Sequence, residues 1–246
     1  MDRLRVHGGQ AGGTEPSNSA FQVRGQPVAL TLSQARSVYD RIGRMQDWQG
    51  FYEDATTERL MAGAALAGGQ TIFEFGCGTG RFAAHLLNSL PDSVTYLGVD
   101  ISPVMINLAT RRLAAWAERA KVVLVEGILP LPADDGSADR VISTFVFDLL
   151  DVHYAREVLD DLRRILTPDG RLCLASLAHG DRPLERAMSQ VWTGLWRVAP
   201  QLVGGCRPVS LTALLGDDWQ IHQHSRVHRF GIVTDVVIAT PNSRHP

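Results

Sequence analysis

Three glycines follow one acidic residue within a short stretch of the chain, Glu74–Gly80, which reads Glu-Phe-Gly-Cys-Gly-Thr-Gly. The apolar run 71–75 is typical of a buried strand, and the run 80–90 has its apolar residues on one side, as a helix does. Glycines at such a turn let the backbone approach a ligand closely, because no Cβ stands in the way. The helix adds unpaired N–H groups and the positive end of its dipole. This stretch therefore predicts a ligand-binding loop.

A second acidic residue, Asp100, follows the next predicted strand at 94–99. At this place in nucleotide-binding sheets a carboxylate accepts the hydroxyls of a ribose. Arg81 stands where the G-x-G-x-x-G loop of dinucleotide-binding proteins needs its third glycine. Glu74 would repel a pyrophosphate but attracts a cationic amino-acid group. These residues favour a sulfonium nucleoside as the ligand, and a glycine-rich turn without any ligand is the alternative.

The elements that must position these residues alternate along the chain. Strands are expected at 71–75, 94–99, 121–126, 140–146 and 171–176, and helices at 80–90, 103–119 and 153–166. Strands that are apolar on both faces and separated by helices indicate a parallel sheet covered on both sides. The runs 219–227 and 230–239 leave no room for a helix between them, so they predict an antiparallel pair at a sheet edge.

A long helix is expected at 182–199. Its apolar residues fall on a common face, formed by Leu184, Met188, Val191, Trp192, Leu195 and Val198. We expect this face to cover the core, and a roof over an acceptor pocket is the alternative. In such a roof the aromatic and apolar side chains would suit an apolar or amine-bearing acceptor, through burial or cation–π attraction.

Three regions are expected. Residues 1–27 are rich in Gly, Ser, Gln and Pro without an apolar period, which predicts a flexible tail. Residues 28–66 carry helical segments and are expected to form an N-terminal helical lid. Residues 67–241 form the ligand-binding domain, in which residues 179–215 are a helical cover on the acceptor side.

The composition argues against several classes of protein. A chain of 246 residues that is 45% apolar can bury a full core. The net charge of −2 gives no basic field, so no nucleic-acid partner is expected. The three cysteines have no C-x-x-C spacing, which argues against a zinc site or a disulfide framework. No apolar run reaches the roughly 20 residues of a membrane-spanning helix, and no secretory signal is evident. We therefore expect a cytoplasmic protein, and peripheral contact with lipid stays open.

The loop and the downstream acid resemble motifs I and II of class I S-adenosylmethionine-dependent methyltransferases. They are most similar to the group that includes the ubiquinone/menaquinone-biosynthesis and phospholipid-amine methyltransferases. The resemblance is good over about residues 35–178, and further matching segments are Val38–Gly43, Gly98–Ser102, Leu131–Pro132, Asp135–Ser137 and Leu166–Leu172. It implies an α/β fold with a Rossmann-like, seven-stranded, mostly parallel sheet, an antiparallel last strand and helices on both faces. It also implies S-adenosyl-L-methionine as the cofactor.

The resemblance assigns roles to individual positions. Those that it implies for cofactor binding are Tyr39, Glu74, Gly76, Gly78, Gly80, Asp100, Ile101, Glu126, Gly127, Ile128 and Thr144. Glu74, Gly76 and the main chain at Thr144 would meet the methionine part, whereas Asp100 would hold the ribose and Ile101 would pack on the adenine. Gly78 and Gly80 would shape the loop.

Two of these assignments carry alternatives. Tyr39 resembles the N-terminal aromatic residue that closes over the cofactor, and a core-facing tyrosine is the other interpretation. Where many relatives read Gly-Asp after the third strand, this chain reads Glu126-Gly127-Ile128. The usual contact between an aspartate and the adenine amino group would then pass to Glu126 or to the backbone around Ile128.

The catalytic candidates are Asp148, His179 and His153, since ligands of open α/β sheets lie at the carboxyl ends of strands. A base is needed only where the methyl acceptor arrives protonated. Asp148 ranks first, because an acid within the apolar run 145–150 needs a partner. A structural role is its alternative, as is an ordinary first-turn position for His153 beside the expected N-cap Asp151.

Three histidines near the C-terminus share a strand with an arginine. His222, His224 and His228 have the same parity as Arg226 and would lie on one strand face. The cationic arginine and the lack of carboxylates nearby in the sequence argue against a metal site. We expect a solvated strand face and no metal.

The sequence therefore predicts a methyltransferase that uses S-adenosylmethionine and acts on a small-molecule acceptor by in-line displacement. The alternative is a non-catalytic S-adenosylmethionine-binding protein with a regulatory or assembly role. A nucleic-acid methyltransferase is disfavoured by the net charge and by Ser143–Val146, which stands in place of the base-holding tetrapeptide of those enzymes. The sequence does not indicate the acceptor atom or the oligomeric state.

Overall fold

The computed structural model describes residues 36, 40, 50–66 and 70–242. The strands are β1 (Thr71–Phe75), β2 (Thr95–Asp100), β3 (Ala120–Leu124), β4 (Ala138–Thr144), β5 (Leu166–Ala178), β6 (Trp219–Arg229) and β7 (Ile232–Pro241). The helices are α2 (Gly50–Gly63), α3 (Arg81–Ser89), α4 (Pro103–Arg112), α5 (Val152–Ile165), α6 (Pro183–Val198) and α7 (Leu211–Leu215). Short 3₁₀ helices are η3 (Ala114–Trp116), η4 (Pro200–Val203) and η5 (Gly216–Asp218). The expected tail, residues 1–27, lies outside the described residues.

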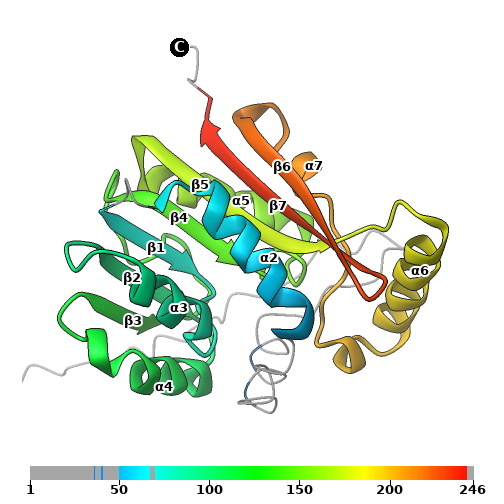
Figure 1. Ribbon diagram of the computed structural model, residues 1–246, viewed down its shortest axis with the longest axis horizontal. Coiled ribbons are helices and arrows are strands. Elements are labelled where there is room, and N and C mark those ends of the chain that lie inside the picture. Colours follow the sequence, from blue (N-terminus) through cyan, green and yellow to red (C-terminus); the bar gives the residue numbers. More distant parts are fainter. Residues whose placement is uncertain (1–35, 37–39, 41–49, 67–69, 243–246) are drawn as a thin grey trace, which may run out of the picture.

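All seven strands belong to one sheet with the order β3-β2-β1-β4-β5-β7-β6. The first five strands run parallel, and β7 pairs antiparallel with both β5 and β6 (Figure 1). This confirms the seven-stranded sheet with an antiparallel last strand. From β1 the chain first adds strands on one side, β2 and then β3, and it then continues on the other side with β4 and β5. Ligands of such sheets bind at the carboxyl ends of the strands where the strand order changes direction, here between β1 and β4.

The sheet separates two apolar cores, because neighbouring residues of a strand point to opposite faces. Phe73 packs with α5 on one face, together with Val141 and Leu162. Ile72 packs on the other face with Leu60 of α2 and Leu86 of α3. α2 crosses β5 and β7 on this second face (Figure 1). It is held there in part by a 2.7 Å hydrogen bond between the hydroxyls of Thr56 and Thr234.

Two elements differ from the expected bounds by five residues or more, and the other predicted strands and helices differ by one or two residues at most at either end. The helix that begins at Pro103 is capped by the Ser102 hydroxyl, which accepts from the Met105 amide, but it ends at Arg112 and continues only as η3. β5 begins at Leu166 instead of residue 171, since Ala138 pairs with Leu166 and the next pair joins Arg140 to Arg171. The expected turn at 168–170 therefore lies within a bulge at the start of β5.

The expected apolar face of the long helix is mostly exposed, and the member of it that packs on an apolar cluster is Trp192. α6 forms as expected, but the exposed fractions of Leu184, Val191 and Val198 are 70%, 60% and 88%. Its buried residues are Glu185 and Trp196. The indole N–H groups of Trp192 and Trp196 donate to the carbonyls of Cys206 and Gly205, so α6 is anchored by its tryptophan side. The apolar period shows which residues share a face, and it does not show which face turns inward.

Candidate functional site

The predicted loop between β1 and α3 has the backbone that its glycines allow. Gly76, Gly78 and Gly80 have φ of +78°, +51° and +71°, in the left-handed region. A Cβ at Gly76 would lie 2.3 Å from Cγ2 of Val146, and a Cβ at Gly80 would lie 3.0 Å from Cα of Ala109. Glycine is therefore required both by conformation and by space, and the loop lies tightly against its neighbours.

Asp100 joins this loop to the end of β2. Its Oδ2 accepts a 2.9 Å hydrogen bond from the Gly78 amide, and its Oδ1 accepts one of 2.8 Å from the Ser102 amide. Burial raises the pKa of Asp100, and these hydrogen bonds oppose the rise. The Ser102 hydroxyl donates to Oδ1 of Asp40 at 2.6 Å, so Asp40 contacts a residue that itself bonds to Asp100.

Glu74 points from β1 into the same region. The residue is 1% exposed, and its Oε2 accepts a 2.5 Å hydrogen bond from the hydroxyl of Tyr96 on β2. Burial raises the pKa of Glu74 to about 7, the tyrosine hydrogen bond lowers it, and the charge of Asp100 adds to the rise. Glu74 thus has a carboxyl group whose ionisation responds to pH near neutrality.

A cavity of about 400 Å³ opens over the loop, within the size range of small-molecule sites. Its walls come from α2, the loop, the start of α3 and the end of β4. The lining residues are Glu53, Asp54, Thr57, Glu58, Glu74, Cys77, Gly78, Thr79, Arg81, Phe82, His85, Thr144 and Phe145. The structure therefore brings together three of the predicted cofactor positions, Glu74, Gly78 and Thr144.

The carboxylates that α2 adds to this cavity could not be predicted from the sequence. Glu53, Asp54 and Glu58 lie within the segment 53–58 of α2, and Asp54 forms an ion pair with Arg81 at the start of α3. With Glu74 they make the walls predominantly acidic, despite Arg81 and His85. A cationic ligand would be favoured here over a phosphate.

The remaining predicted cofactor positions are arranged as follows. Glu126 is exposed and Ile128 is 69% exposed, at the loop that follows β3. Gly127 has φ of +73°, and its carbonyl accepts a 2.8 Å hydrogen bond from the Tyr154 hydroxyl. Ile101 is partly buried directly after Asp100. Tyr39 lies outside the described residues.

The three catalytic candidates lie in different surroundings. Asp148 is fully buried. His153 is on the surface, where its side chain is 88% exposed and its Nε2 lies 3.5 Å from Glu157. The Asp151 carboxylate caps α5 as expected, accepting from the His153 and Tyr154 amides. His179 is also exposed after β5. Both histidines stay predictions as catalytic residues.

Asp148 has one carboxyl oxygen without a hydrogen-bond partner among the described residues. Its Oδ2 accepts from the Leu177 amide at 3.3 Å, whereas its Oδ1 is buried and unpaired. Burial raises the pKa of Asp148 to about 7, and the charge of Arg207 opposes this rise. The neighbouring apolar cluster is formed by Phe145, Leu149, Leu177, Trp192, Cys206 and Ile232.

Arg207 lies near Asp148, and sequence patterns did not indicate it. Its amide donates to the Asp148 carbonyl at 3.0 Å, and its guanidinium donates to the Leu150 carbonyl at 2.8 Å. The guanidinium carbon lies 5.4 Å from the ring centre of Trp196. A segment of irregular chain after α6 supplies this arginine, so no local period could have predicted it.

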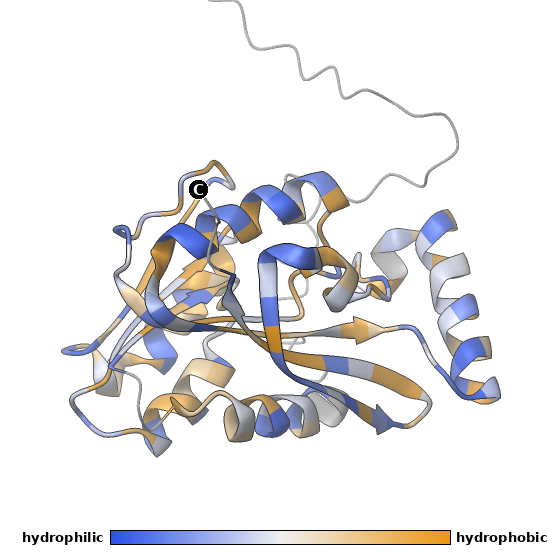
Figure 2. Ribbon diagram, turned by 90° about the horizontal axis from the view of Figure 1, so that it is seen from above, coloured by the Kyte–Doolittle hydropathy of each residue, from blue (hydrophilic) through white to orange (hydrophobic). Residues whose placement is uncertain are grey.

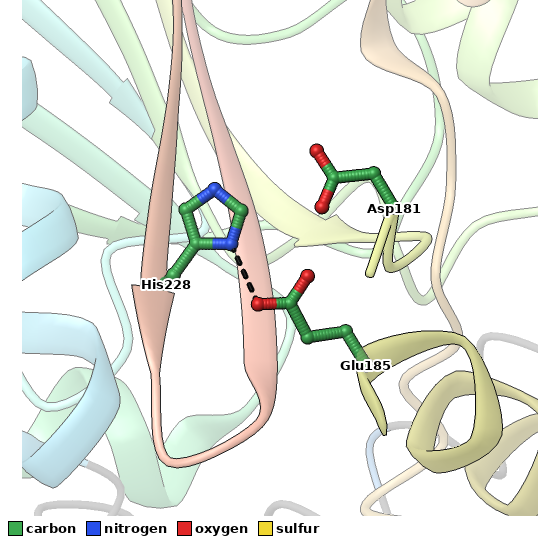
Figure 3. Close-up of side chains that lie close together, drawn as sticks. All are labelled: Asp181, Glu185 and His228. Atoms are coloured by element: carbon green, nitrogen blue, oxygen red, sulfur yellow. Dashed lines mark hydrogen bonds and ion pairs between the residues drawn. The ribbon is translucent and has the colours of Figure 1, made fainter. Parts of the chain in front are cut away.

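The strand of histidines has carboxylate neighbours that the sequence pattern did not suggest. Nδ1 of His228 lies 2.8 Å from Oε1 of Glu185, and Nε2 of His224 lies 3.2 Å from Oδ1 of Asp235. Asp181, Glu185 and His228 bring donor atoms within 4.8 Å of one another (Figure 3). Arg226 lies 3.5 Å from Asp181 and Arg182 lies 3.6 Å from Glu185, so cations already face both carboxylates. The absence of a metal stays a prediction.

Comparison with known proteins identifies the family. A family model described as a methyltransferase domain matches residues 73–172. A demethylmenaquinone methyltransferase of Clavibacter sepedonicus is 31% identical over 182 residues, which are 72% of this chain and 67% of that protein. The chain belongs to the class I S-adenosylmethionine-dependent methyltransferases. A malonyl-[acyl-carrier protein] O-methyltransferase of Hahella chejuensis is 32% identical over 150 residues, 61% of this methyltransferase and 49% of the relative.

Solved structures share the fold of this methyltransferase. The [4+2]-cyclase SpnF superimposes with a TM-score of 0.66 at 16% identity, over 87% of this chain and 98% of the cyclase. The N-methyltransferase NodS of Bradyrhizobium japonicum, in complex with S-adenosyl-L-homocysteine, gives a TM-score of 0.60 at 16% identity, over 78% and 88% of the two chains. Since a cyclase is among these neighbours, the fold by itself does not determine the reaction.

The enzyme uses S-adenosyl-L-methionine as its cofactor, and the residues of the site fit that molecule. Gly78, with φ of +51°, lines the cavity, so the loop presents a backbone without a Cβ to the ligand. The acidic walls suit a ligand with a sulfonium and an ammonium group. Asp100 lies at the end of β2, where a carboxylate can accept ribose hydroxyls.

Proposed function

We propose that this methyltransferase transfers the methyl group to a ring carbon of a small, apolar quinol. The observation that carries this proposal is the buried carboxyl group of Asp148, which has an unpaired Oδ1 beside an apolar cluster. Similarity to quinone-pathway enzymes supports it. Besides the relative from Clavibacter, a ubiquinone/menaquinone biosynthesis C-methyltransferase of Citrifermentans bemidjiense is 25% identical over 205 residues, 80% of this chain and 82% of that protein.

The residues of the cavity would hold the cofactor by its charged and polar groups. Glu74, supported by Tyr96, would attract the ammonium group, with the main chain of Thr144 beside it. Asp100 would accept the ribose hydroxyls while it keeps its bonds to the loop. The expected lid 28–66 is supported by α2, whose first turns line the cavity. When bound, S-adenosylmethionine supplies a methyl group on a positively charged sulfur.

Asp148 would act as the base. Its carboxylate would take the proton of the acceptor hydroxyl at Oδ1, and the resulting phenolate would raise the electron density of the adjacent ring carbon. The new carbon–carbon bond would form there as the bond between the methyl group and the cofactor sulfur breaks, which leaves that sulfur as a neutral thioether. The hydrogen on that carbon then leaves as a proton to solvent, while Asp148 returns its proton to the ring oxygen. A base with a pKa of about 7 is well matched to this task near neutral pH.

The apolar cluster would bind the acceptor ring and exclude water. Phe145 lines the cofactor cavity and also belongs to the cluster, so it joins the two regions. Leu149 and Trp192 offer apolar surface on the side of Asp148. This arrangement supports residues 179–215 as a cover on the acceptor side, because Trp192 lies on α6.

The test is turnover by the full chain with cofactor carrying a ¹³C-labelled methyl group. The acceptor panel contains a demethylated naphthoquinol, a catechol, an acyl carboxylate and phosphatidylethanolamine, and NMR locates the label in each product. We expect a carbon-bound methyl group on the naphthoquinol. A methyl group found only on oxygen or nitrogen would contradict the proposal. Cofactor binding without turnover of any acceptor would favour the non-catalytic alternative.

A further inference from the structure

α6 exposes a continuous apolar surface. Five of its apolar residues have exposed fractions between 39% and 88%: Leu184, Met188, Val191, Leu195 and Val198, here called the α6 stripe. Their spacing of four, three, four and three residues places them on one side of the helix. An exposed apolar surface of this length on a helix is typical of an interaction site.

The turn between β6 and β7 extends this surface. Phe230 in that turn is 71% exposed, and a Cβ at the adjacent Gly231 would lie 3.6 Å from Cε of Met188. The turn and α6 lie side by side at the same end of the molecule in both views (Figures 1 and 2). Two elements far apart in sequence therefore present apolar side chains together.

The exposed charges on α6 and beside it are mostly cationic, and the exposed acid, Asp181, already faces Arg226 at 3.5 Å. Arg182, Arg186 and Arg197 are exposed on or beside α6, and Arg229 is exposed next to Phe230. Glu185, the acidic residue within α6, is 5% exposed and bonded to His228, so its charge is directed inward (Figure 3). This local excess of positive charge contrasts with the net charge of −2 of the whole chain.

We propose that the α6 stripe and Phe230 dock onto the surface of an anionic lipid bilayer. A helix that lies in the bilayer interface has an apolar face and a polar face rich in arginine or lysine, which interacts with anionic headgroups. α6 carries both features, since Arg186 and Arg197 lie on the side of the helix opposite the stripe. Among the described residues no helix is long and apolar enough to cross a bilayer, so the contact would be peripheral.

Docking in this orientation would bring the bilayer close to the acceptor side of the enzyme. The other side of α6 carries Trp192, which packs on the apolar cluster beside Asp148. An acceptor dissolved in the bilayer would then have a short path to that cluster. The docking proposal does not depend on the acceptor, because lipid binding is measured without cofactor or acceptor.

The experiment is vesicle flotation of the full chain. Vesicles of phosphatidylcholine mixed with phosphatidylglycerol are compared with vesicles of phosphatidylcholine alone, at low and high salt. We expect binding to the anionic vesicles that weakens with salt. In a variant with L184Q, V191Q and V198Q the fraction of protein bound to vesicles should fall about tenfold or more, since these substitutions remove apolar side chains that would be buried in the bilayer. R186Q with R197Q should remove most of the salt dependence.

The matched control is Val152→Gln, which changes a valine of α5 that is 47% exposed, away from the stripe. This variant should float like the unchanged protein, and circular dichroism checks that all variants fold. Equal flotation of the triple variant and the unchanged protein would overturn the proposal. A second result would also overturn it: the protein does not bind vesicles, sedimentation velocity detects a dimer, and the triple variant is monomeric. The α6 stripe would then be the contact surface for a second copy of the chain.

Discussion

The hydroxyl of Tyr96 donates a 2.5 Å hydrogen bond to Oε2 of Glu74, across the neighbouring strands β2 and β1. Gly98, two residues after Tyr96 on β2, is the residue that pairs with Glu74. A Cβ at Gly98 would lie 2.5 Å from the hydroxyl oxygen of Tyr96. Glycine at position 98 thus makes room for this contact. Tyr96 fixes the orientation of Glu74 and favours its ionised form, opposing the effect of burial on its pKa.

Replacing Tyr96 by phenylalanine should weaken cofactor binding in a pH-dependent way. Without the hydroxyl, the pKa of Glu74 rises further above about 7, so less of it is ionised at neutral pH. We expect S-adenosylmethionine to bind about tenfold more weakly at pH 7, the worth of one hydrogen bond to a charged group. The loss should shrink as pH rises, because Glu74 then ionises in the variant too. Calorimetry between about pH 6 and pH 9 measures both quantities.

An affinity loss that stays the same at every pH would show that Tyr96 acts only through packing. The variant keeps the ring, which is buried with α3 and η3 side chains, so its fold should survive. Thermal unfolding provides the check. A Glu74→Gln variant should bind weakly at all pH values, and adding Tyr96→Phe to it should change little.

The fold and the cofactor loop could be predicted because their signals are local. A strand, three glycines and a helix follow one another directly at β1, Gly76–Gly80 and α3, and Asp100 ends the next strand. Parallel strands then bring these parts to one edge of the sheet without any further information. The antiparallel pairing of β6 with β7 could also be predicted locally, because the short connection between the two strands leaves no room for a helix.

The contacts that depend on three-dimensional packing could not be predicted. Tyr96 reads as a core residue of an apolar strand, and its bond to Glu74 depends on the register of β1 against β2. The acidic residues of α2 reach the cavity because α2 packs across β5 and β7. α6 has the predicted period, but two tryptophans anchor its other side. The apolar period of a helix does not show which other element each of its faces will contact.

Replacing Asp148 by asparagine should lower kcat by about 10²-fold or more, the usual contribution of a general base. Cofactor affinity should stay unchanged, because Glu74 and Asp100 remain. The asparagine keeps an oxygen to accept from the Leu177 amide, so the local backbone is preserved. Steady-state rates with the naphthoquinol, against pH, measure the effect, and the rise of activity through about pH 7 should disappear.

The matched control is Asp151→Asn, three residues further on. Asparagine caps helices about as well as aspartate, so α5 should be retained and kcat should change little. If both variants lost activity equally, the effect would come from the segment after β4 and not from a base. Unchanged activity of Asp148→Asn would remove Asp148 from the mechanism.

The stability of the cofactor-free enzyme should fall as pH rises through neutrality. Burial raises the pKa of Glu74 and of Asp148 to about 7, from ordinary values of 4.5 and 3.8. Between these values the folded chain holds protons that the unfolded chain has lost, so the free energy of unfolding decreases as pH rises. Each group accounts for on the order of 3 kcal/mol across this range. Urea denaturation at about pH 5, 6, 7 and 8 measures the slope.

Removing both carboxyl groups with E74Q and D148N should flatten this dependence. The control pair D151N and E157Q changes two exposed acids of α5, the second of them the partner of His153, and should leave the slope unchanged. A free energy of unfolding that rises between pH 5 and pH 8 in the unchanged protein would contradict the assignment. An unaltered slope in the first pair would do the same.

Replacing Gly76 by alanine should abolish tight cofactor binding. The Cβ would meet Cγ2 of Val146 at 2.3 Å, so the loop or the segment after β4 must move. Gly136 offers a matched control, because its φ of +60° is similar to the +78° of Gly76, yet a Cβ there meets nothing within 4 Å. Both variants carry the backbone strain, about 1 kcal/mol, and only Gly76→Ala carries the clash. We expect Gly136→Ala to lower stability slightly and to bind S-adenosylmethionine normally. Gly76→Ala should bind about 10²-fold more weakly by calorimetry, and equal affinity in the two variants would mean that the loop tolerates displacement and does not shape the site.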